Sequence, residues 1–399
     1  MKEAKVTVID ACMGKGKTTY VIDLMRNSAS YKKYIYITPL LKEVERIRKA
    51  VASQKFKVPE DRKGHGSKYE HFKQLIEEGA NIVTTHALFK KVDERLLGLL
   101  KREDYTLIVD EVFEVINKVG FTKSDFDLLV DKGLIESEEY GRVVWKENPA
   151  YNGRFNDIKE MALAGTLYFV NDMAFAWNFP AKIFKAFEKV YLLTYMFDGQ
   201  LQKYYYDFHG VSYVYKTIGN NGELEDYKDD KEERQKYRKL INVYEGRMNE
   251  IGEWEYALSK SWYERNPNKL SKLKNNLVNF FININKAKSR QIMWTTFKDY
   301  MDALKGRGYT KSFTSCTLRA TNDYDDRTVL AYTINRYLHP IPKAFFTERG
   351  IEVNEDLVAL TDLLQWLFRS AVRKGEEVTL YIPSRRMRTL LTRWLEGEM

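Results

Sequence analysis

A glycine-containing loop near the start of the sequence has the residue types that bind phosphate. Residues 11–19 read Ala-Cys-Met-Gly-Lys-Gly-Lys-Thr-Thr, between an apolar run and an amphipathic stretch. Gly14 and Gly16 let backbone N–H groups turn toward an anion, and a helix amino terminus adds a favourable dipole. Lys17 can reach the β- and γ-phosphates of ATP, and the Thr18 hydroxyl can ligate Mg²⁺. The predicted ATP site comprises Met13, Gly14, Lys15, Gly16, Lys17, Thr18 and Thr19.

Two adjacent carboxylates end a second apolar run. Asp110 and Glu111 directly follow the segment Tyr-Thr-Leu-Ile-Val. In a phosphate-loop ATPase such a pair stands at the tip of a neighbouring strand, where Asp110 would hold Mg²⁺ and Glu111 would polarise the attacking water. An apolar run ending in Asp-Glu is common by itself, so the inference depends on the upstream loop. Lys17, Asp110 and Glu111 are the predicted catalytic residues of this part of the chain.

Short apolar runs alternate with helical patterns in two parts of the sequence, which predicts parallel sheets with covering helices. In the first 200 residues or so we expect strands at Val6–Asp10, Tyr34–Thr38, Asn81–Thr85, Thr106–Asp110 and Lys189–Thr194, and helices at Lys17–Asn27 and Leu41–Gln54. After Arg290 we expect strands at Gln291–Thr295, Lys311–Thr317, Val329–Ile334 and Val378–Ile382, and helices at Asp299–Lys305, Asn354–Arg373 and Arg385–Trp394.

The order of these motifs resembles that of superfamily 2 helicases and translocases. Two segments, Thr38-Pro39 and Thr85-His86, stand where that family has threonine-containing segments that hold the nucleic-acid backbone. The segment Leu192–Met196 stands where the family has a Thr-Ala-Thr motif that couples hydrolysis to movement, although the usual small residue is missing here. The Asp-Glu-Val form at 110–112 differs from the common Asp-Glu-Ala-Asp and Asp-Glu-Ala-His forms, and is somewhat similar to viral origin-binding replication helicases.

The second half of the sequence extends the resemblance. Gln291–Thr296 resembles the first strand of the family's second domain, and Arg319–Asp323 resembles its Gly-Thr-Asn motif, with Ala320 in place of glycine. Residues 365–373 resemble the glutamine–arginine–arginine helix, in which an arginine stabilises charge on the transferring phosphoryl group. Arg369 and Arg373 are four residues apart and are expected to share a helix face, so either could serve.

The resemblance implies an α/β fold with two RecA-like parallel-sheet domains. Residues 1–206 would form the first, with the phosphate loop, and residues 289–399 the second, with the arginine helix. Between them, residues 207–288 are expected to form a mostly helical, basic and aromatic insertion or linker, which could hold a strand or fork or serve as a solvated spacer. The implied catalytic residues of the second domain are Gln365, Arg369 and Arg373. The implied nucleic-acid contacts are Thr38, Pro39, Thr85, His86, Thr295, Arg319, Thr321 and Asn322.

Composition sets limits on the class of protein. The 399 residues carry a formal net charge of +9, which favours an anionic partner, although a solvated basic surface accounts for it equally well. Aromatic residues make up 14% of the chain, so some rings could stack on bases. The two cysteines and five histidines show no ligand spacing, so no structural zinc is expected. No apolar stretch is long enough for a membrane span or signal peptide, and a cytoplasmic location is expected, in the host cell if the protein is viral.

These observations predict an ATP-dependent helicase or translocase. It would use ATP and Mg²⁺ and act on single-stranded or forked nucleic acid, DNA in preference to RNA, without a membrane. A role in phage or viral replication or recombination would bring protein partners of those pathways. Two alternatives stay open at this point. One is a packaging-type motor ATPase, and the other is a nucleic-acid binding protein whose affinity ATP regulates.

Overall fold

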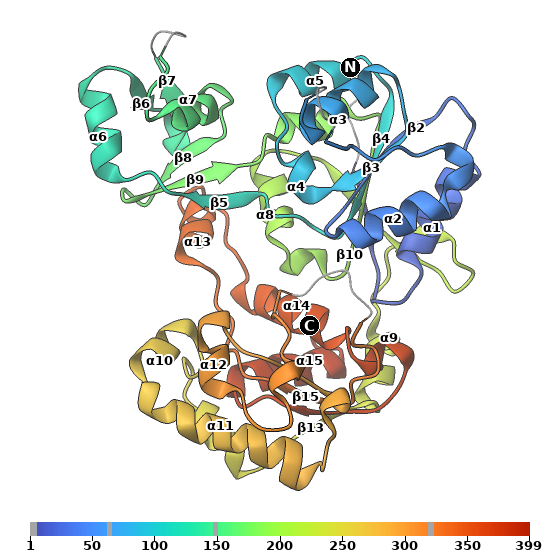
Figure 1. Cartoon of the computed structure of the whole chain (residues 1–399), viewed down its shortest axis with the longest axis vertical. Helices are drawn as coiled ribbons and strands as arrows, with labels where there is room; N and C mark the ends of the chain where they lie inside the picture. Colours follow the sequence, from blue (N-terminus) through green and yellow to red (C-terminus); the bar gives the residue numbers. More distant parts are fainter. Residues whose placement is uncertain (1–5, 62–65, 147–150, 318–322) are drawn as a thin grey trace. The chain divides into compact units, whose positions relative to one another are not determined.

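The computed structural model describes residues 6–61, 66–146, 151–317 and 323–399 (Figure 1). The chain divides into two compact units. The first unit comprises Met1–Ala11, Lys15–Tyr227 and Leu338–Asn354, and the second comprises Cys12–Gly14, Lys228–Tyr337 and Glu355–Met399. Within the described part of the chain, no helix combines the length and apolar character needed to cross a membrane.

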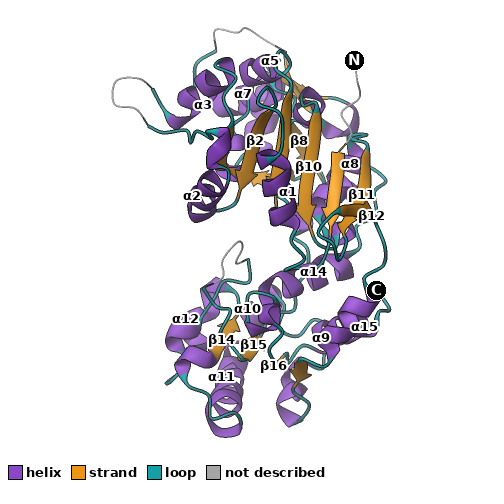
Figure 2. Ribbon diagram, turned by 90° about the vertical axis from the view of Figure 1, so that its right-hand side faces the viewer, coloured by secondary structure: helices purple, strands orange, loops and turns teal. Residues whose placement is uncertain are grey.

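A seven-stranded sheet forms the centre of the first unit, in the order β12-β11-β1-β10-β4-β2-β3 (Figure 2). All neighbours are parallel except β12, which is antiparallel to β11. The central strands are buried on both faces, which is why they appear in the sequence as mostly apolar runs. All five strands expected in this half are present. The bounds are β1 Val6–Asp10, β2 Lys33–Thr38, β3 Ile82–Thr85, β4 Tyr105–Asp110, β10 Lys189–Thr194, β11 Tyr213–Ile218 and β12 Leu224–Asp226.

Amphipathic helices cover this sheet. In α1, Val21 and Ile22 lie four and three residues before Met25, and all three are buried in one cluster with Ile9 and Tyr36 of the sheet. Side-chain oxygens cap several helix amino termini, as Ser67 does for α3. The helices are α1 Lys17–Arg26, α2 Leu41–Ala50, α3 Lys68–Glu77, α4 His86–Phe89, α5 Glu94–Leu100 and α8 Leu201–Phe208.

Between β4 and β10 the chain builds a small antiparallel subdomain that the sequence analysis did not predict. Its three-stranded sheet has the order β5-β9-β8, and β6 and β7 form a separate hairpin (Figure 1). A core of its own holds it together, with Phe126, Trp145 and Phe175 among the buried side chains. We call it the middle subdomain; its elements are β5 Ile116–Val119, α6 Lys123–Asp131, β6 Ile135–Ser137, β7 Val143–Trp145, α7 Asn156–Leu163, β8 Leu167–Val170 and β9 Ala174–Asn178.

A segment from much later in the chain packs on the middle subdomain. Residues 338–354, which we call the strap, include α13 Pro340–Thr347, and α13 lies against β5, β8 and β9. The buried Arg349 side chain fastens it. Its guanidinium lies 4.0 Å from the Phe345 ring centroid and 5.4 Å from that of Tyr168, and its Nη1 donates to the Phe345 carbonyl at 2.7 Å. Burial lowers the pKa of Arg349, because the charged form loses solvent.

The second unit contains a four-stranded, fully parallel sheet in the order β13-β16-β15-β14. Its strands are β13 Ile241–Val243, β14 Ile292–Thr295, β15 Val329–Tyr332 and β16 Val378–Tyr381. Its helices are α9 Lys231–Arg238, α10 Lys260–Arg265, α11 Leu270–Val278, α12 Met301–Leu304, α14 Glu355–Leu367 and α15 Arg385–Glu396.

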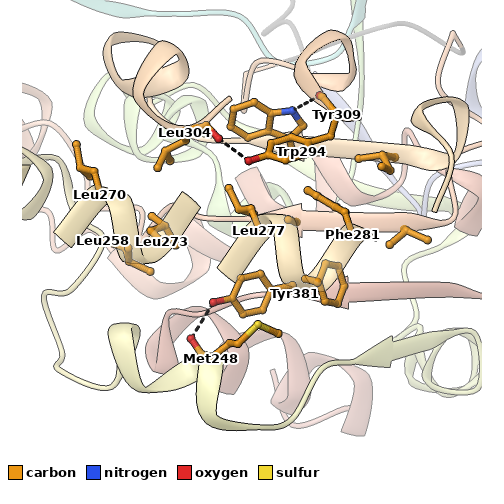
Figure 3. Packing of buried hydrophobic residues seen from close by; sticks show 14 of the residues in the cluster. Met248, Leu258, Leu270, Leu273, Leu277, Phe281, Trp294, Leu304, Tyr309 and Tyr381 are labelled. Carbon is orange, nitrogen blue, oxygen red and sulfur yellow. Dashed lines mark hydrogen bonds between the residues drawn. The ribbon is translucent and has the colours of Figure 1, made fainter. Parts of the chain in front are cut away.

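Large aromatic side chains fill the core on one side of this sheet (Figure 3). Three of them reach a backbone carbonyl with their polar atoms: Trp294 Nε1 donates to Tyr309 at 2.9 Å, the Tyr309 hydroxyl to Leu304 at 2.6 Å, and the Tyr381 hydroxyl to Met248 at 2.8 Å. These bonds offset the cost of burying the polar atoms and fix the orientation of the rings.

Two regions differ in detail from the expected elements. Lys311–Thr317 is not a strand: it forms a 3₁₀ turn at Thr310–Ser312 and then makes a single bridge from Phe313 to Trp294. The segment therefore follows the edge of β14 without extending the sheet. Residues 207–288 contain helices α9, α10 and α11, and they also supply β11 and β12 to the first sheet and β13 to the second.

We predict that Arg349→Ala destabilises the first unit by about 2 kcal/mol, because it removes charge-assisted hydrogen bonds and cation–π contacts from a buried position. Urea unfolding followed by circular dichroism would measure the loss. Arg95→Ala is the matched control, because Arg95 is 65% exposed and pairs with Glu77 at 3.6 Å. Equal stability of the two variants would contradict a fastening role for Arg349.

Candidate active site

The predicted site residues of the first unit gather at one edge of its sheet. Strands β1, β10, β4, β2 and β3 are parallel, so their carboxyl ends share that edge, where open α/β sheets bind ligands. Strand β10 lies between β1, which leads into the phosphate loop, and β4, which ends at Asp110. Two strand spacings separate β1 from β4 by about 10 Å, enough for phosphate groups and a hydrated cation. The fold therefore brings together residues that lie nearly a hundred positions apart in the sequence.

The phosphate loop has the backbone that its glycines predict. Gly14 has φ 86° and Gly16 has φ 84°, both in the left-handed region. A Cβ at either position would meet no neighbouring atom, so the backbone angle is the reason for glycine here. Gly16 also precedes the first turn of α1, and its carbonyl accepts from the Tyr20 N–H at 2.9 Å. The Lys17 ammonium donates to the Ala11 carbonyl, so this side chain folds back along the loop.

A buried carboxylate joins the phosphate-loop strand to β10. Asp10 is 4% exposed, and its two oxygens accept from the backbone N–H groups of Met196 at 2.8 Å and Phe197 at 2.7 Å. The Ala11 N–H also donates to the Thr194 carbonyl at 3.2 Å. The segment Leu192–Met196, assigned a coupling role by resemblance, thus has a direct physical connection to the start of the loop. Asp10 was not among the residues predicted from the sequence, although an ionisable residue that ends an apolar strand is a visible signal.

Asp110 lies in an environment that disfavours its negative charge. Burial, together with the adjacent Glu111, raises the pKa of Asp110 from 3.8 to about 6. Tyr36 acts in the opposite direction and favours the carboxylate, although its hydroxyl lies outside normal hydrogen-bond geometry. Glu43 and Arg46 of α2, joined by a 2.7 Å hydrogen bond, contribute smaller opposing effects. A bound cation would relieve the cost of this charge.

Glu111 has a backbone conformation that is rare for its residue type. Its φ is 64°, in the left-handed region, and its N–H donates to the Leu193 carbonyl of β10 at 3.0 Å. Non-glycine residues in this region carry a conformational cost and cluster at functional sites. The hydrogen bond to β10 holds the turn in place, so both carboxylates of the Asp-Glu pair are positioned by neighbouring strands.

The threonines expected to contact nucleic acid lie at strand ends. Thr38, at the end of β2, and Thr295, at the end of β14, are completely buried. Thr85 is half-buried, and its Oγ1 accepts from the Leu88 N–H at 3.3 Å as the cap of α4. Their position at the strand ends was predictable, whereas their burial depends on surrounding elements.

The remaining expected nucleic-acid contacts fall into three groups. His86 is buried, with its ring 5.6 Å from that of Phe113. Pro39 is half-buried beside the exposed Leu40. Arg319, Thr321 and Asn322 lie outside the described residues.

The expected glutamine–arginine–arginine helix ends early. Helix α14 stops at Leu367, so it includes Gln365 but neither arginine. The Ser370 hydroxyl and N–H both donate to the Leu367 carbonyl, at 2.6 and 3.0 Å, and turn the chain out of the helix. Arg369 follows the helix and is 8% exposed, whereas Arg373 lies in a 3₁₀ turn and is exposed. The prediction that the two arginines share a helix face is therefore wrong.

Arg386 and Arg388, near the start of α15, have partners inside the second unit. Arg386 Nη2 lies 2.6 Å from Asp356, and Arg388 Nη1 donates to the Pro383 carbonyl at 2.6 Å. Arg386 therefore joins α15 to the start of α14, and Arg388 stabilises the turn before α15.

Comparison with known proteins places these features in a family. Two family models match: the YonV middle domain over residues 116–177 and the YonV C-terminal Rossmann-like domain over residues 235–395. The SPbeta prophage-derived protein YonV of Bacillus subtilis (strain 168) is 40% identical over 408 residues, which cover 99% of each chain. Among solved structures, S. tokodaii Xpd4 matches with a TM-score of 0.50 at 12% identity, over 97% of this chain and 93% of that one.

These findings agree with the observed architecture. The middle-domain model coincides with the middle subdomain, and the C-terminal model covers the four-stranded parallel sheet. The likeness to Xpd4 extends over both units and confirms the expected fold class, an α/β fold with two RecA-like parallel-sheet domains. With 40% identity over nearly its whole length to the B. subtilis protein, the chain belongs to the YonV family.

Proposed function

We propose that this protein is an ATP-dependent helicase or translocase that acts on single-stranded or forked nucleic acid, DNA in preference to RNA. The observation that carries the proposal is the position of the phosphate loop and the Asp110-Glu111 pair at one sheet edge, separated by a single strand. The prophage origin of the B. subtilis relative supports a role in phage replication or recombination.

The residues at this edge fit ATP with Mg²⁺. The left-handed glycines of the loop leave N–H groups free of side-chain obstruction, and the Thr18 hydroxyl and the Asp110 carboxylate are hard oxygen ligands. Among the described residues, no group of three or more His, Cys, Asp or Glu side chains could hold a metal. A cation here would therefore be shared with the nucleotide phosphates and water, as is usual for Mg²⁺. It would neutralise charge on the phosphates.

Each residue then has a distinct part in hydrolysis. Lys17 leaves the Ala11 carbonyl to contact the β- and γ-phosphates, and Glu111 polarises the attacking water. Arg369 or Arg373 of the second RecA-like domain stabilises the charge that develops on the transferring phosphoryl group. Asp10 transmits changes at the loop to the segment after β10, because it holds that segment by two hydrogen bonds.

We predict that Lys17→Ala and Glu111→Gln each lower ATP turnover more than about a hundredfold, because each removes a group that acts on the phosphates or the water. Binding to single-stranded DNA should persist in both. Steady-state hydrolysis with single-stranded DNA, single-stranded RNA and duplex DNA would measure the loss of turnover and identify the nucleic acid that stimulates it. Lys32→Ala, which breaks an ion pair with Glu188 outside the loop, serves as control.

Two results would count against this proposal. Wild-type turnover that no nucleic acid stimulates would favour a motor driven by a protein partner, as in packaging-type ATPases. Nucleic-acid binding that responds to ATP without any turnover would favour a protein whose affinity ATP regulates.

We predict that Asp110→Asn makes the protein more stable at pH 8, without nucleotide or Mg²⁺, by about 2 kcal/mol. The raised pKa of Asp110 means that the folded state binds more protons than the unfolded state between pH 3.8 and about 6. Wild-type stability therefore falls as the pH rises through this range, and the asparagine variant lacks that loss. Urea unfolding at pH 8 and pH 4 would show a difference that disappears at pH 4. An Asp127→Asn control removes an exposed carboxylate and should show no such pattern.

We predict that the two arginines after α14 respond differently to alanine. Arg373→Ala should lower nucleic-acid-stimulated turnover at least about tenfold without changing the unfolding midpoint, because the side chain is exposed. Arg369→Ala should lower the unfolding midpoint as well, because it vacates a buried position. Turnover and thermal unfolding measured on the same preparations would separate the two effects. Normal turnover by Arg373→Ala would exclude Arg373 from catalysis.

A further inference from the structure

A row of aromatic side chains lies on the surface of the second unit. Trp254 is 62% exposed and Tyr256 is 47% exposed, with ring centroids 5.4 Å apart. Tyr256 stacks with Tyr337 at 5.6 Å and an interplanar angle of 27°. The Arg386 guanidinium lies 4.4 Å from the Tyr337 ring centroid and ends the row. We call these four side chains the aromatic row.

We propose that the aromatic row is a stacking site for the bases of a single-stranded nucleic acid, an inference that rests on the proposed function. Every base has a π-face that can stack on an aromatic ring, so such a site holds a strand with little sequence preference. A motor that moves along a strand needs contacts that accept any base, because each step brings a different base to the same site.

The loop that carries Trp254 and Tyr256 is held firmly in place. A Cβ at Gly252 would lie 1.9 Å from the Pro383 carbonyl oxygen, so the loop approaches the chain after β16 as closely as only glycine allows. The Asn335 side chain donates to the carbonyls of Glu255 at 2.7 Å and Ala257 at 3.0 Å. The rings are therefore positioned before any ligand binds, which reduces the entropy lost on binding.

The same loop buries other apolar residues and leaves Trp254 in water. Leu258 is completely buried, at a left-handed φ of 63°, and Trp262 and Tyr263 of α10 are core residues. The backbone at Leu258 thus adopts a strained conformation that buries its side chain, while the larger indole of Trp254, four residues earlier, stays exposed. An exposed indole on a rigid loop adds little to the stability of this unit, and large exposed apolar groups of this kind mark binding surfaces.

The position of the aromatic row in the fold agrees with this role. The loop at 244–258 follows β13, the segment ending at Tyr337 follows β15, and Arg386 follows β16. These three strands are parallel, so all of these segments leave the sheet at its carboxyl edge, where α/β sheets bind ligands.

The charges around the row favour bases over phosphates as the groups that touch it. Arg386 pairs with Asp356, and Arg388 pairs with Glu253. Glu255, which lies between Trp254 and Tyr256 in the sequence, is exposed. An exposed carboxylate at this point repels phosphate, whereas it leaves the neutral face of a base unaffected. Binding at the row should therefore depend little on salt, in contrast to phosphate contacts.

The test measures binding of a fluorescein-labelled oligothymidylate of about 20 nucleotides to the full chain, by fluorescence anisotropy over a range of salt concentrations. Trp254→Ala and Tyr256→Ala should each weaken binding about tenfold without changing the slope of log affinity against log salt. Trp254→Phe should retain most of the affinity. The oligonucleotide should quench less tryptophan fluorescence in this variant than in the wild type, because the exposed indole is missing. Tyr31→Ala, which removes a tyrosine that is 75% exposed on the first unit, is the control.

The outcomes separate the two proposals. A wild-type protein that does not bind the oligonucleotide contradicts the proposed function and this inference together. Wild-type binding that Trp254→Ala and Tyr256→Ala leave unchanged overturns the stacking site alone, as does a loss of affinity accompanied by a smaller salt slope, which indicates a phosphate contact. Thermal unfolding of each variant confirms that a loss of affinity reflects the missing ring.

Discussion

The hydrogen bonds of Asp10 are the constraint on which the geometry of the candidate site depends. One buried carboxylate at the end of β1 holds the backbone after β10, more than 180 residues away in sequence, by two charge-assisted bonds. Because β10 also accepts the Glu111 N–H through Leu193, it connects the phosphate loop to the Asp-Glu pair. The middle subdomain leaves the sheet between β4 and β10 without disturbing this arrangement. A large insertion at this point is compatible with the site. The register of the parallel strands β1, β10 and β4, and not the length of the connection, sets the distance between the phosphate loop and the Asp-Glu pair.

Unfavourable features are concentrated at the same edge. Asp110 carries its charge in a partly buried place, and Glu111 adopts a left-handed backbone conformation. Both are costs to the folded state that a smaller or neutral side chain would avoid, and the strands around them keep them in place. Such destabilising residues are expected at a site that binds a cation and orients a reacting water, because residues that serve chemistry often lower the stability of the folded state.

The sequence was sufficient for the parts of the structure that depend on local pattern. Strands buried on both faces are mostly apolar, so β1, β4 and β10 could be predicted, and the glycine loop followed from its own residues. The middle subdomain was missed because its strands are only three to five residues long, although the left-handed Asn171 and Asp172 between β8 and β9 lie in a hairpin turn of readable composition. Burial is a tertiary property. A motif could place Thr38 and Thr295 at strand ends, but it could not show that both side chains are buried. Likewise, the spacing of Arg369 and Arg373 could not show that α14 ends before them, where Ser370 bonds to the Leu367 carbonyl.

The strap packs on the middle subdomain and is continuous in sequence with the second unit at both of its ends. The chain leaves the second unit after Tyr337, packs α13 on the middle subdomain, and returns at Glu355 to begin α14. It is thus covalently continuous with β15 on one side and with the helix of Gln365 on the other. The buried Arg349 fastens the strap to the subdomain, since its guanidinium lies against the rings of Phe345 and Tyr168. The middle subdomain is therefore held by a segment that the chain reaches only after residues 228–337 of the second unit, and not only by the strands between which it is inserted.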